Sequence, residues 1–127
     1  MNAFPGNMTF QTLIESRVTT GRFDVNRSID DDVIREIIRL ATHAPSAFNM
    51  QNWHFIAIRS AEAKEKLCTL AFGQRQVKEA AVTFIICGIL DGYRGLHETL
   101  QPSVEAGLIP AALQEQWSTM VTELHQD

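Results

Sequence analysis

The apolar run at residues 82–87 (VTFIIC) constrains the fold of this chain more than any other feature. Such a run is typical of a central strand that is covered on both faces. Only residues 54–59 (HFIAIR), which alternate and are rich in β-forming side chains, predict a second strand as clearly. Because a stable sheet usually needs three or more strands, we expect the missing neighbours to come from another chain or from an absent C-terminal half.

Residues 30–43 carry the strongest helical signal. Three aspartates at positions 30–32 stand at the N-terminus, where the helix dipole favours negative charge, and Pro45 lies just beyond the other end. Its apolar side chains recur at helical spacing: Val33, Ile34, Ile37, Ile38 and Ala41. We interpret the aspartates as stabilising the helix end rather than as a metal site.

Further helices are predicted before and between the two strands. Thr9 is a candidate N-cap for a short first helix, which has apolar side chains on one side. Ser60 is a candidate N-cap for a helix that runs to Ala71, with Leu67 and Leu70 facing inward. A polar segment at residues 73–79 then leads into the apolar strand.

The signal weakens after the second strand. Residues 91–100 are expected to be partly helical, residues 107–110 to form a turn, and Pro110 to open a last helix. The apolar side of that helix is predicted to comprise Leu113, Trp117, Met120, Val121 and Leu124. A chain of 127 residues is long enough for one domain.

Composition excludes several classes of partner. The formal net charge is -4 and no run of Lys or Arg is present, so binding to a nucleic-acid backbone is not expected. No segment approaches the roughly 20 apolar residues of a membrane helix, and the N-terminus does not have the pattern of a signal peptide. We expect a cytoplasmic protein in which Cys68 and Cys87 are buried, reduced thiols.

Motifs for nucleophilic or metal chemistry are not found. Ser46 does not lie in a Gly-x-Ser-x-Gly elbow, and the four histidines do not have metal-ligand spacing. Neither a Gly-x-Gly-x-x-Gly fingerprint nor a P-loop occurs in the sequence. We therefore assign no catalytic side chain and no metal site.

Two segments remain that could hold a ligand. Residues 16–23 (SRVTTGRF) offer guanidinium groups and hydroxyls, which suit a phosphate because guanidinium donates in a fork and a hydroxyl adds a further donor. Residues 44–53 (APSAFNMQNW) could bring backbone amides and polar side chains against a flat heteroaromatic ring. For each segment taken alone, a simpler interpretation is favoured. The first would be a solvated loop, and the second a turn capped by Ser46 with Trp53 in the core.

Together the two segments resemble the nitroreductase family. That family has an Arg-Arg-Ser-x-Arg-x-Phe element, then a helix, then Ala-Pro-Ser-x-x-Asn-x-Gln-Pro-Trp running into a strand. Here RVTTGRF, DDDVIREIIRLATH, APSAFNMQNW and HFIAIR follow in the same order, and the resemblance covers residues 11–90. It implies an α+β fold in which helices surround a mixed, mostly antiparallel sheet, and a homodimer with FMN between its subunits.

The resemblance also implies roles for individual residues. Arg17 and Thr19 match the Arg and Ser that grip the FMN phosphate, while Gln74 lies where relatives carry an amide near the flavin ring. A second group matches the loop that the other subunit lays against the flavin: Pro45, Ser46 and Asn49. The implied reaction is ping-pong. NAD(P)H reduces FMN by hydride transfer, and FMN then reduces a nitroaromatic or quinone-like small molecule.

Three departures from the family pattern qualify these expectations. Gly21 stands where the family has a second phosphate-binding Arg, with Arg22 adjacent as a candidate substitute, and Asn52 replaces a Pro. Family members also continue well beyond this length, so we expect residues 1–127 to be one C-terminally truncated domain. The alternative to an FMN-dependent oxidoreductase is a non-catalytic family member that acts as a dimeric flavin-binding or structural module.

Overall fold

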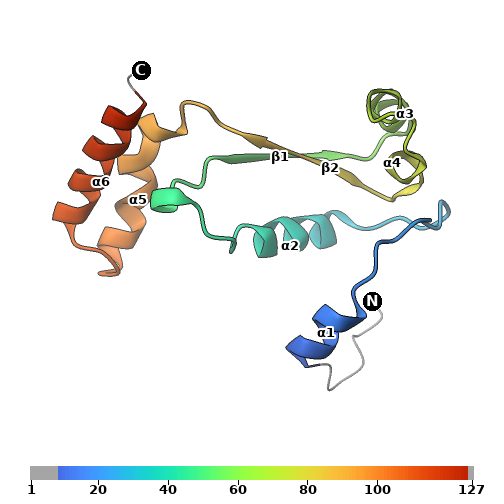
Figure 1. Ribbon diagram of the computed structural model, residues 1–127, viewed down its shortest axis with the longest axis horizontal. Helices are drawn as coiled ribbons and strands as arrows, with labels where there is room; N and C mark the ends of the chain where they lie inside the picture. The colour runs from blue at the N-terminus through green and yellow to red at the C-terminus, as the bar shows by residue number, and fades with distance from the viewer. Residues whose placement is uncertain (1–8, 126–127) are drawn as a thin grey trace.

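The computed structural model describes residues 9–125, which form helices around a two-stranded hairpin (Figure 1). The elements in chain order are α1 Phe10–Ser16, α2 Asp31–Ala41, η1 Ala47–Asn49, β1 Trp53–Ile58, α3 Ala61–Leu70, α4 Arg75–Glu79, β2 Thr83–Gly88, η2 Gly92–Gly95, α5 Leu96–Glu105 and α6 Ala111–Leu124. Runs of helices precede, separate and follow two strands that pair antiparallel, and the α+β class is confirmed. No helix in this part of the chain has both the length and the apolar character needed to cross a bilayer.

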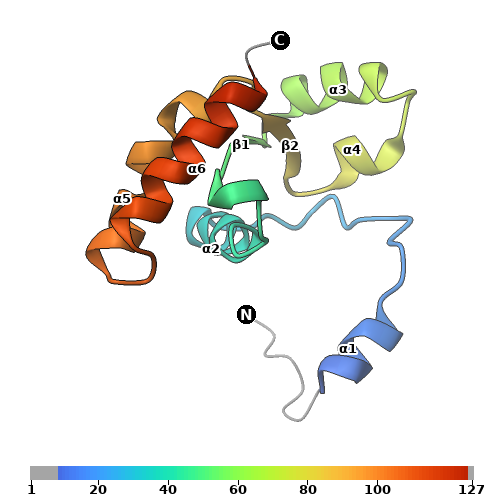
Figure 2. The same cartoon turned by 60° about the vertical axis from the view of Figure 1, so that its left-hand side comes forward.

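The hairpin pairs β1 with β2 in antiparallel register, from Trp53 opposite Gly88 to Ile58 opposite Thr83. Helix α2 runs alongside it in both ribbon views (Figures 1 and 2). Apolar side chains of α2 and of the hairpin surround a small cavity of about 100 Å³ between them: Ile37, Ile38, Ala41, Phe55, Phe84 and Ile86. The helical stripe and the strand alternation therefore meet in one apolar layer, because each presents one side to the other.

Strand β2 is less covered than its apolar sequence predicts. None of residues 82–87 is fully buried, and the side chain of Ile86 is 68% exposed. The physical reason is that, among the described residues, β2 has one strand partner and leaves its other edge unpaired. This partial exposure is compatible with the expectation that the strand needs further neighbours from outside the chain, which stays a prediction.

The fully buried core lies at the α5–α6 end. Leu96, Leu100 and Val121 form it. Next to them the buried amide of Gln114 donates to the carbonyl oxygen of His97 at 2.7 Å and to Oε1 of Gln101 at 3.0 Å. These two bonds satisfy an amide that would otherwise be costly to bury between the helices.

Local capping signals are confirmed, but some predicted packing is not. The hydroxyls of Thr9 and Ser60 accept hydrogen bonds from the N–H groups of Thr12 and Ala63. Leu70 was predicted to face inward, yet it is 79% exposed, because the buried side of α3 is centred on Cys68. Both cysteines are free thiols, and Cys87 is only half-buried.

A few other details differ from the sequence-based expectations. The predicted polar segment at residues 73–79 contains the short helix α4, and Leu124, predicted on the apolar side of the last helix, is 66% exposed. Asp30 occupies the N-cap position of α2 without a side-chain cap bond, while Asp31 pairs with Arg59. The aspartates therefore stabilise the helix end mainly by charge and by this ion pair.

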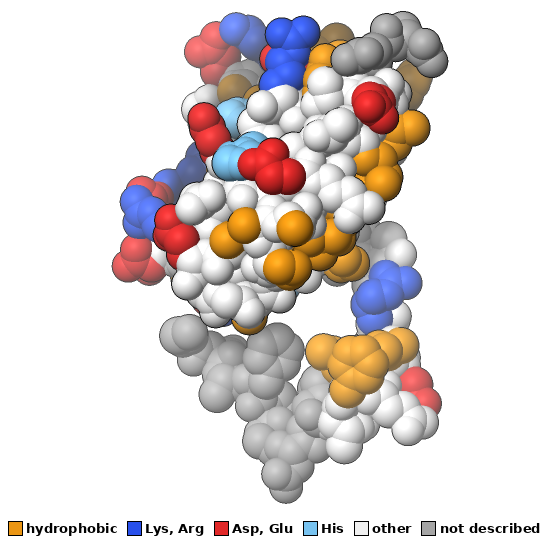
Figure 3. Space-filling model, turned by 90° about the vertical axis from the view of Figure 1, so that its left-hand side faces the viewer, with side chains coloured by type: hydrophobic (Ala, Val, Ile, Leu, Met, Phe, Trp, Pro, Cys, Tyr) orange, Lys and Arg blue, Asp and Glu red, His pale blue; other side chains and the backbone are white. Residues whose placement is uncertain are grey.

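The chain exposes much more surface than a compact monomer would. Its accessible area is 9979 Å² for a mass of 14.3 kDa, roughly half as much again as the ~6,800 Å² that monomers of this mass expose. Helix α1 buries no residue, and its Phe10 is 78% exposed. Figure 3, which faces the α5–α6 end, shows apolar side chains open at the surface there too.

Candidate flavin site

The segment that carries the predicted phosphate ligands leaves α1 as an exposed loop. Arg17 is the C-cap residue of α1, and Thr19 and Gly21 follow it, all three exposed. Within the described residues the Arg17 guanidinium has neither an ion pair nor a hydrogen bond. An exposed, unengaged guanidinium with a hydroxyl two residues on is a donor set that fits a phosphate group.

Gly21 does not require glycine for its backbone. It is not among the residues with positive φ, and a Cβ built on it would meet nothing within 4 Å. Larger side chains therefore fit at this position without strain. The family's arginine is absent from this position for a reason that neither backbone geometry nor space explains.

Arg22, the candidate substitute, is already engaged. Its Nε lies 3.4 Å from Oε2 of Glu79, at the end of α4, and the N–H of Phe23 donates to the same oxygen at 3.4 Å. The side chain of Glu79 is only 12% exposed, whereas that of Arg22 is 69% exposed. The guanidinium is thus held toward α4 by a carboxylate that is largely shielded from water.

The loop between α2 and β1 has an unusual backbone. Three of its non-glycine residues have positive φ: Phe48 at 53°, Asn49 at 52° and Gln51 at 50°. Such conformations cost about 1–3 kcal/mol each and persist only where surrounding contacts impose them. Phe48 supplies one such contact, since it packs against the buried core of α5 and α6.

The predicted flavin-facing residues lie on this loop. Pro45 and Asn49 are exposed, and Ser46 is half-buried. Ser46 is the N-cap residue of η1, but its Oγ accepts from the N–H of Gln51 at 3.0 Å instead of capping the helix. Ser46 therefore precedes a helical turn, as the simpler interpretation predicts, but its side chain does not cap that turn, and Trp53 is half-buried rather than in the core. Asn49 stays open to a ligand.

Gln74 lies on a third segment. It is the exposed N-cap residue of α4 and follows two residues in the left-handed region, Phe72 with φ 56° and Gly73 with φ 72°. Its carbonyl accepts the thiol of Cys68 at 3.2 Å. The backbone at Gln74 is thereby fixed to the buried side of α3, and its amide side chain remains free in solvent.

The structure places these residues at two ends of the molecule. The loop with Arg17, Thr19 and Gly21 lies at the end of the hairpin where α4 carries Gln74, whereas the 45–49 loop lies at the opposite end, beside α5 and α6 (Figures 1 and 2). Helix α2 separates the two ends, and its 11 residues span about 16 Å. One chain by itself does not bring the two groups of candidate ligands together.

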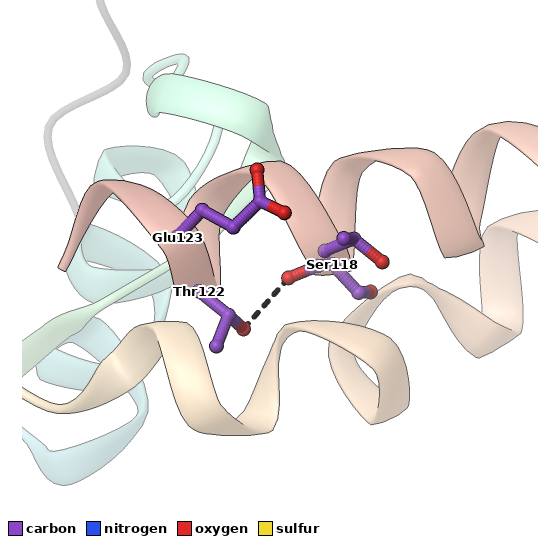
Figure 4. A pocket seen from close by; sticks show the side chains of 4 residues that line it. Ser118, Thr122 and Glu123 are labelled. Carbon is purple, nitrogen blue, oxygen red and sulfur yellow. Dashed lines mark hydrogen bonds between the residues drawn. The ribbon is translucent and has the colours of Figure 1, made fainter. Parts of the chain in front are cut away.

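Most hydroxyl donors of a further hollow are already engaged within its helix. This hollow, which is shallow and lies on α6, is lined by Ser118, Thr119, Thr122 and Glu123 (Figure 4). Two of its hydroxyls are used within the helix, because Thr122 donates to the carbonyl of Ser118 at 2.7 Å and Ser118 donates to that of Gln114 at 2.8 Å. In residues 9–125 no group of three or more His, Cys, Asp and Glu side chains is arranged to hold a metal ion.

Comparison with known proteins gives the family. The family model described as "Nitroreductase family" matches residues 14–115, which include every candidate ligand discussed above. The chain belongs to the nitroreductase family. The family membership that the order of motifs suggested is therefore confirmed.

Relatives of this nitroreductase-family chain are oxidoreductases by name. The "Putative NAD(P)H nitroreductase YodC" of Bacillus subtilis is 32% identical over 97 residues, which is 76% of this chain and 48% of that protein. The NADH dehydrogenase of Thermus thermophilus is 36% identical over 78 residues, 61% of this chain and 38% of that protein. The chain spans about half the length of YodC and of the "Putative NAD(P)H nitroreductase YdgI" of the same organism.

A solved structure from the same family has the same fold. A "putative nitroreductase in complex with FMN" from Exiguobacterium sibiricum has a TM-score of 0.80 and 26% identity, over 94% of this chain and 58% of that one. The structural match therefore extends beyond the residues 11–90 over which the motif resemblance was recognised.

Sequence reasoning missed two features of the candidate site. Glu79 was not recognised as a partner of Arg22 and Phe23 in the loop after α1. Its spacing of four from Arg75 suggests only a local helical pair. The left-handed backbone at Phe48 was not expected either, because no local signal marks it in a bulky residue. Both depend on contacts between distant segments.

Proposed function

We propose that this chain binds FMN between two copies of itself and acts as an NAD(P)H-dependent oxidoreductase. The observation that carries the proposal is the separation of the two motifs at opposite ends of α2 and the hairpin. A two-fold dimer resolves that separation, since it can set the 17–21 loop of one copy beside the 45–49 loop of the other and repeats the site twice.

The phosphate end of the site is proposed to use Arg17 and Thr19. Arg17 is exposed and has no internal ionic partner among the described residues, so the guanidinium can turn to a ligand without breaking an existing contact. Gln74 lies at the same end and would meet the flavin ring. The exposed Gly21 supplies no cation, so we expect a weaker grip on the phosphate than an Arg-Arg pair would provide.

The ring end is proposed to use the partner copy's Pro45, Ser46 and Asn49. Phe48 anchors this loop to the α5–α6 core, which makes it a rigid support rather than a mobile flap. A rigid support lowers the entropy that must be lost when a planar ligand is bound. The structure in which the Exiguobacterium sibiricum relative is in complex with FMN supports the choice of ligand.

Surface area supports self-association. Among residues 9–125 of one copy, eighteen large hydrophobic side chains are exposed, including Phe72 at 98% and Leu90 at 92%. Obligate homodimers bury about 2,000–5,000 Å² in total, an amount that the excess exposed area of two copies can supply. We therefore propose a homodimer, and the expectation that residues 1–127 form one incomplete domain stays a prediction.

The chemistry would come from the cofactor. FMN, when bound, would accept a hydride from NAD(P)H and deliver electrons to a nitroaromatic or quinone-like acceptor. The residues of this chain would hold and orient the ring and limit access of water. The second candidate, a flavin-binding or structural module without turnover, is favoured by one observation: the absence of a cation at Gly21.

Reconstitution with FMN tests both candidates. The purified protein would be incubated with FMN, passed through a desalting column, and examined by visible absorption before and after anaerobic addition of NADPH or NADH. Retained flavin that bleaches with either nucleotide supports the oxidoreductase. Retained flavin that does not bleach supports the non-catalytic flavin-binding module. A colourless protein at micromolar concentration contradicts both the oxidoreductase and the flavin-binding module, and leaves a structural module.

A further inference from the structure

Glu79 stands out among the charged residues of the protein. It is the last residue of α4, and its side chain is 12% exposed, far less than the other carboxylates in ion pairs. Oε2 lies 3.4 Å from Nε of Arg22 and accepts from the N–H of Phe23, while Oε1 lies 3.4 Å from Nε of Arg75. A shielded carboxylate with donors on both oxygens is a built feature rather than a solvated surface charge.

This carboxylate connects two segments that are distant in sequence. Phe23 and Glu79 are 56 positions apart, and the contact links the loop after α1 to the helix that Gln74 begins. Within the described part of the chain, no other hydrogen bond or ion pair ties residues 18–28 to a segment outside them. Residues 18–28 are all exposed, and Phe23, at 42%, is the least exposed of their large apolar side chains, so the loop has no fully buried apolar anchor.

The charges around Glu79 also suit an anion nearby. The carboxylate is flanked by two guanidinium groups, so the cluster carries a net positive charge and does not repel a phosphate at the neighbouring loop. Arg22 is committed to this cluster, two residues after the hydroxyl of Thr20 and directly after Gly21. Its pairing with Glu79 therefore competes with its use in place of the arginine that the family carries at the position of Gly21.

We propose that Glu79 is a positioning residue for the phosphate loop, residues 17–23, which carries the proposed phosphate ligands Arg17 and Thr19. By holding Phe23 and Arg22 against α4, it fixes the direction in which Arg17, Thr19 and the backbone at Gly21 are presented. The role in ligand binding rests on the proposed function, whereas the role in ordering the loop does not. The loop and α4 form one unit through this carboxylate, and the ligand would meet a preformed phosphate grip.

The test compares Glu79→Gln with Glu62→Gln, a matched change in the exposed ion pair between Glu62 and Lys66. Hydrogen exchange of residues 18–28 is measured without ligand, and FMN and riboflavin are then titrated into each variant. We expect exchange in the loop to rise only in Glu79→Gln. FMN affinity should fall about tenfold, the effect of one hydrogen bond to a charged group, while riboflavin, which has no phosphate, should bind within about twofold of wild type.

Each result bears on the proposal. Unchanged hydrogen exchange in Glu79→Gln overturns the role of Glu79 in ordering residues 18–28. Equal losses of affinity for FMN and riboflavin overturn its link to phosphate binding. A gain in FMN affinity also overturns it, because freed Arg22 would then be the phosphate ligand. If wild type binds no flavin, the proposed function fails, yet the comparison of hydrogen exchange still decides whether Glu79 orders residues 18–28. Should Glu79→Gln not fold, Arg22→Gln, at a 69% exposed side chain, provides the same two measurements.

Discussion

The ring of Phe48 meets the ring of Trp117 edge-on, with centroids 5.9 Å apart and planes at 77°. Phe48 belongs to the loop proposed to face the flavin, and Trp117 belongs to α6. The contact makes the position of the loop depend on the α5–α6 core, although 69 positions separate the two residues. Edge-to-face pairs contribute about 0.5–1.5 kcal/mol beyond the area that they bury.

Loss of this contact should loosen the loop as well as the core. We expect Phe48→Ala to lower the free energy of unfolding by about 2–3 kcal/mol, somewhat below the value for a fully buried phenylalanine, since Phe48 is half-buried. Chemical denaturation would measure the loss, with Phe72→Ala as the control at a 98% exposed site. Similar small effects for both variants would show that Phe48 does not anchor the loop.

The phosphate grip is tested by Arg17→Ala. Removal of a charge-assisted contact should weaken FMN binding by about 1.5–3 kcal/mol and leave the melting temperature unchanged, because Arg17 has no described internal partner. Arg35→Ala, at the exposed Arg35–Asp32 pair of α2, is the control and should bind FMN like wild type. Isothermal titration with FMN makes the comparison. Equal affinity for Arg17→Ala and wild type would remove Arg17 from the site.

Gly21→Arg should strengthen FMN binding without a loss of stability. The backbone there does not have positive φ and no atom lies within 4 Å of an added Cβ, so the side chain fits without strain. Gly73→Arg is the contrasting variant, since φ is +72° and the substitution should cost about 1 kcal/mol. Thermal melts and FMN titrations of both would be recorded. A Gly21→Arg protein that binds no tighter would argue that the phosphate lies elsewhere.

Self-association should depend on protein concentration. The apolar side chains on α1 are exposed to solvent, and the second edge of β2 has no strand partner among the described residues. A second copy of the chain can bury those side chains and protect that edge. Sedimentation velocity over a wide dilution series should show dimer giving way to monomer, with a melting temperature that rises with concentration. A monomer at every dilution, with a melt that does not change, would contradict the two-copy site.

Local signals in the sequence determined most of the secondary structure. Thr9 and Ser60 cap their helices as predicted, because a cap depends only on residues up to three positions away. The bounds of α2 also follow their prediction closely, since its charge pattern and apolar spacing repeat within a few turns. Of its apolar stripe only Ile34 is buried, while Val33 and Ile37 are 40% and 42% exposed. The motifs around Arg17 and Ser46 could be recognised for the same reason: each is a continuous stretch of sequence.

Tertiary structure alone decided how those pieces are used. Leu70 has a place in the helical pattern, yet the buried side of α3 is centred on Cys68 and leaves Leu70 79% exposed. The pairing of Arg22 with Glu79 and the left-handed backbone of Phe48 arise from contacts across many tens of residues, which no local pattern encodes. The two candidate motifs lie at opposite ends because the extended hairpin and α2 hold them apart. Burial and distance are properties of the whole packed chain, whereas propensity and spacing belong to its segments.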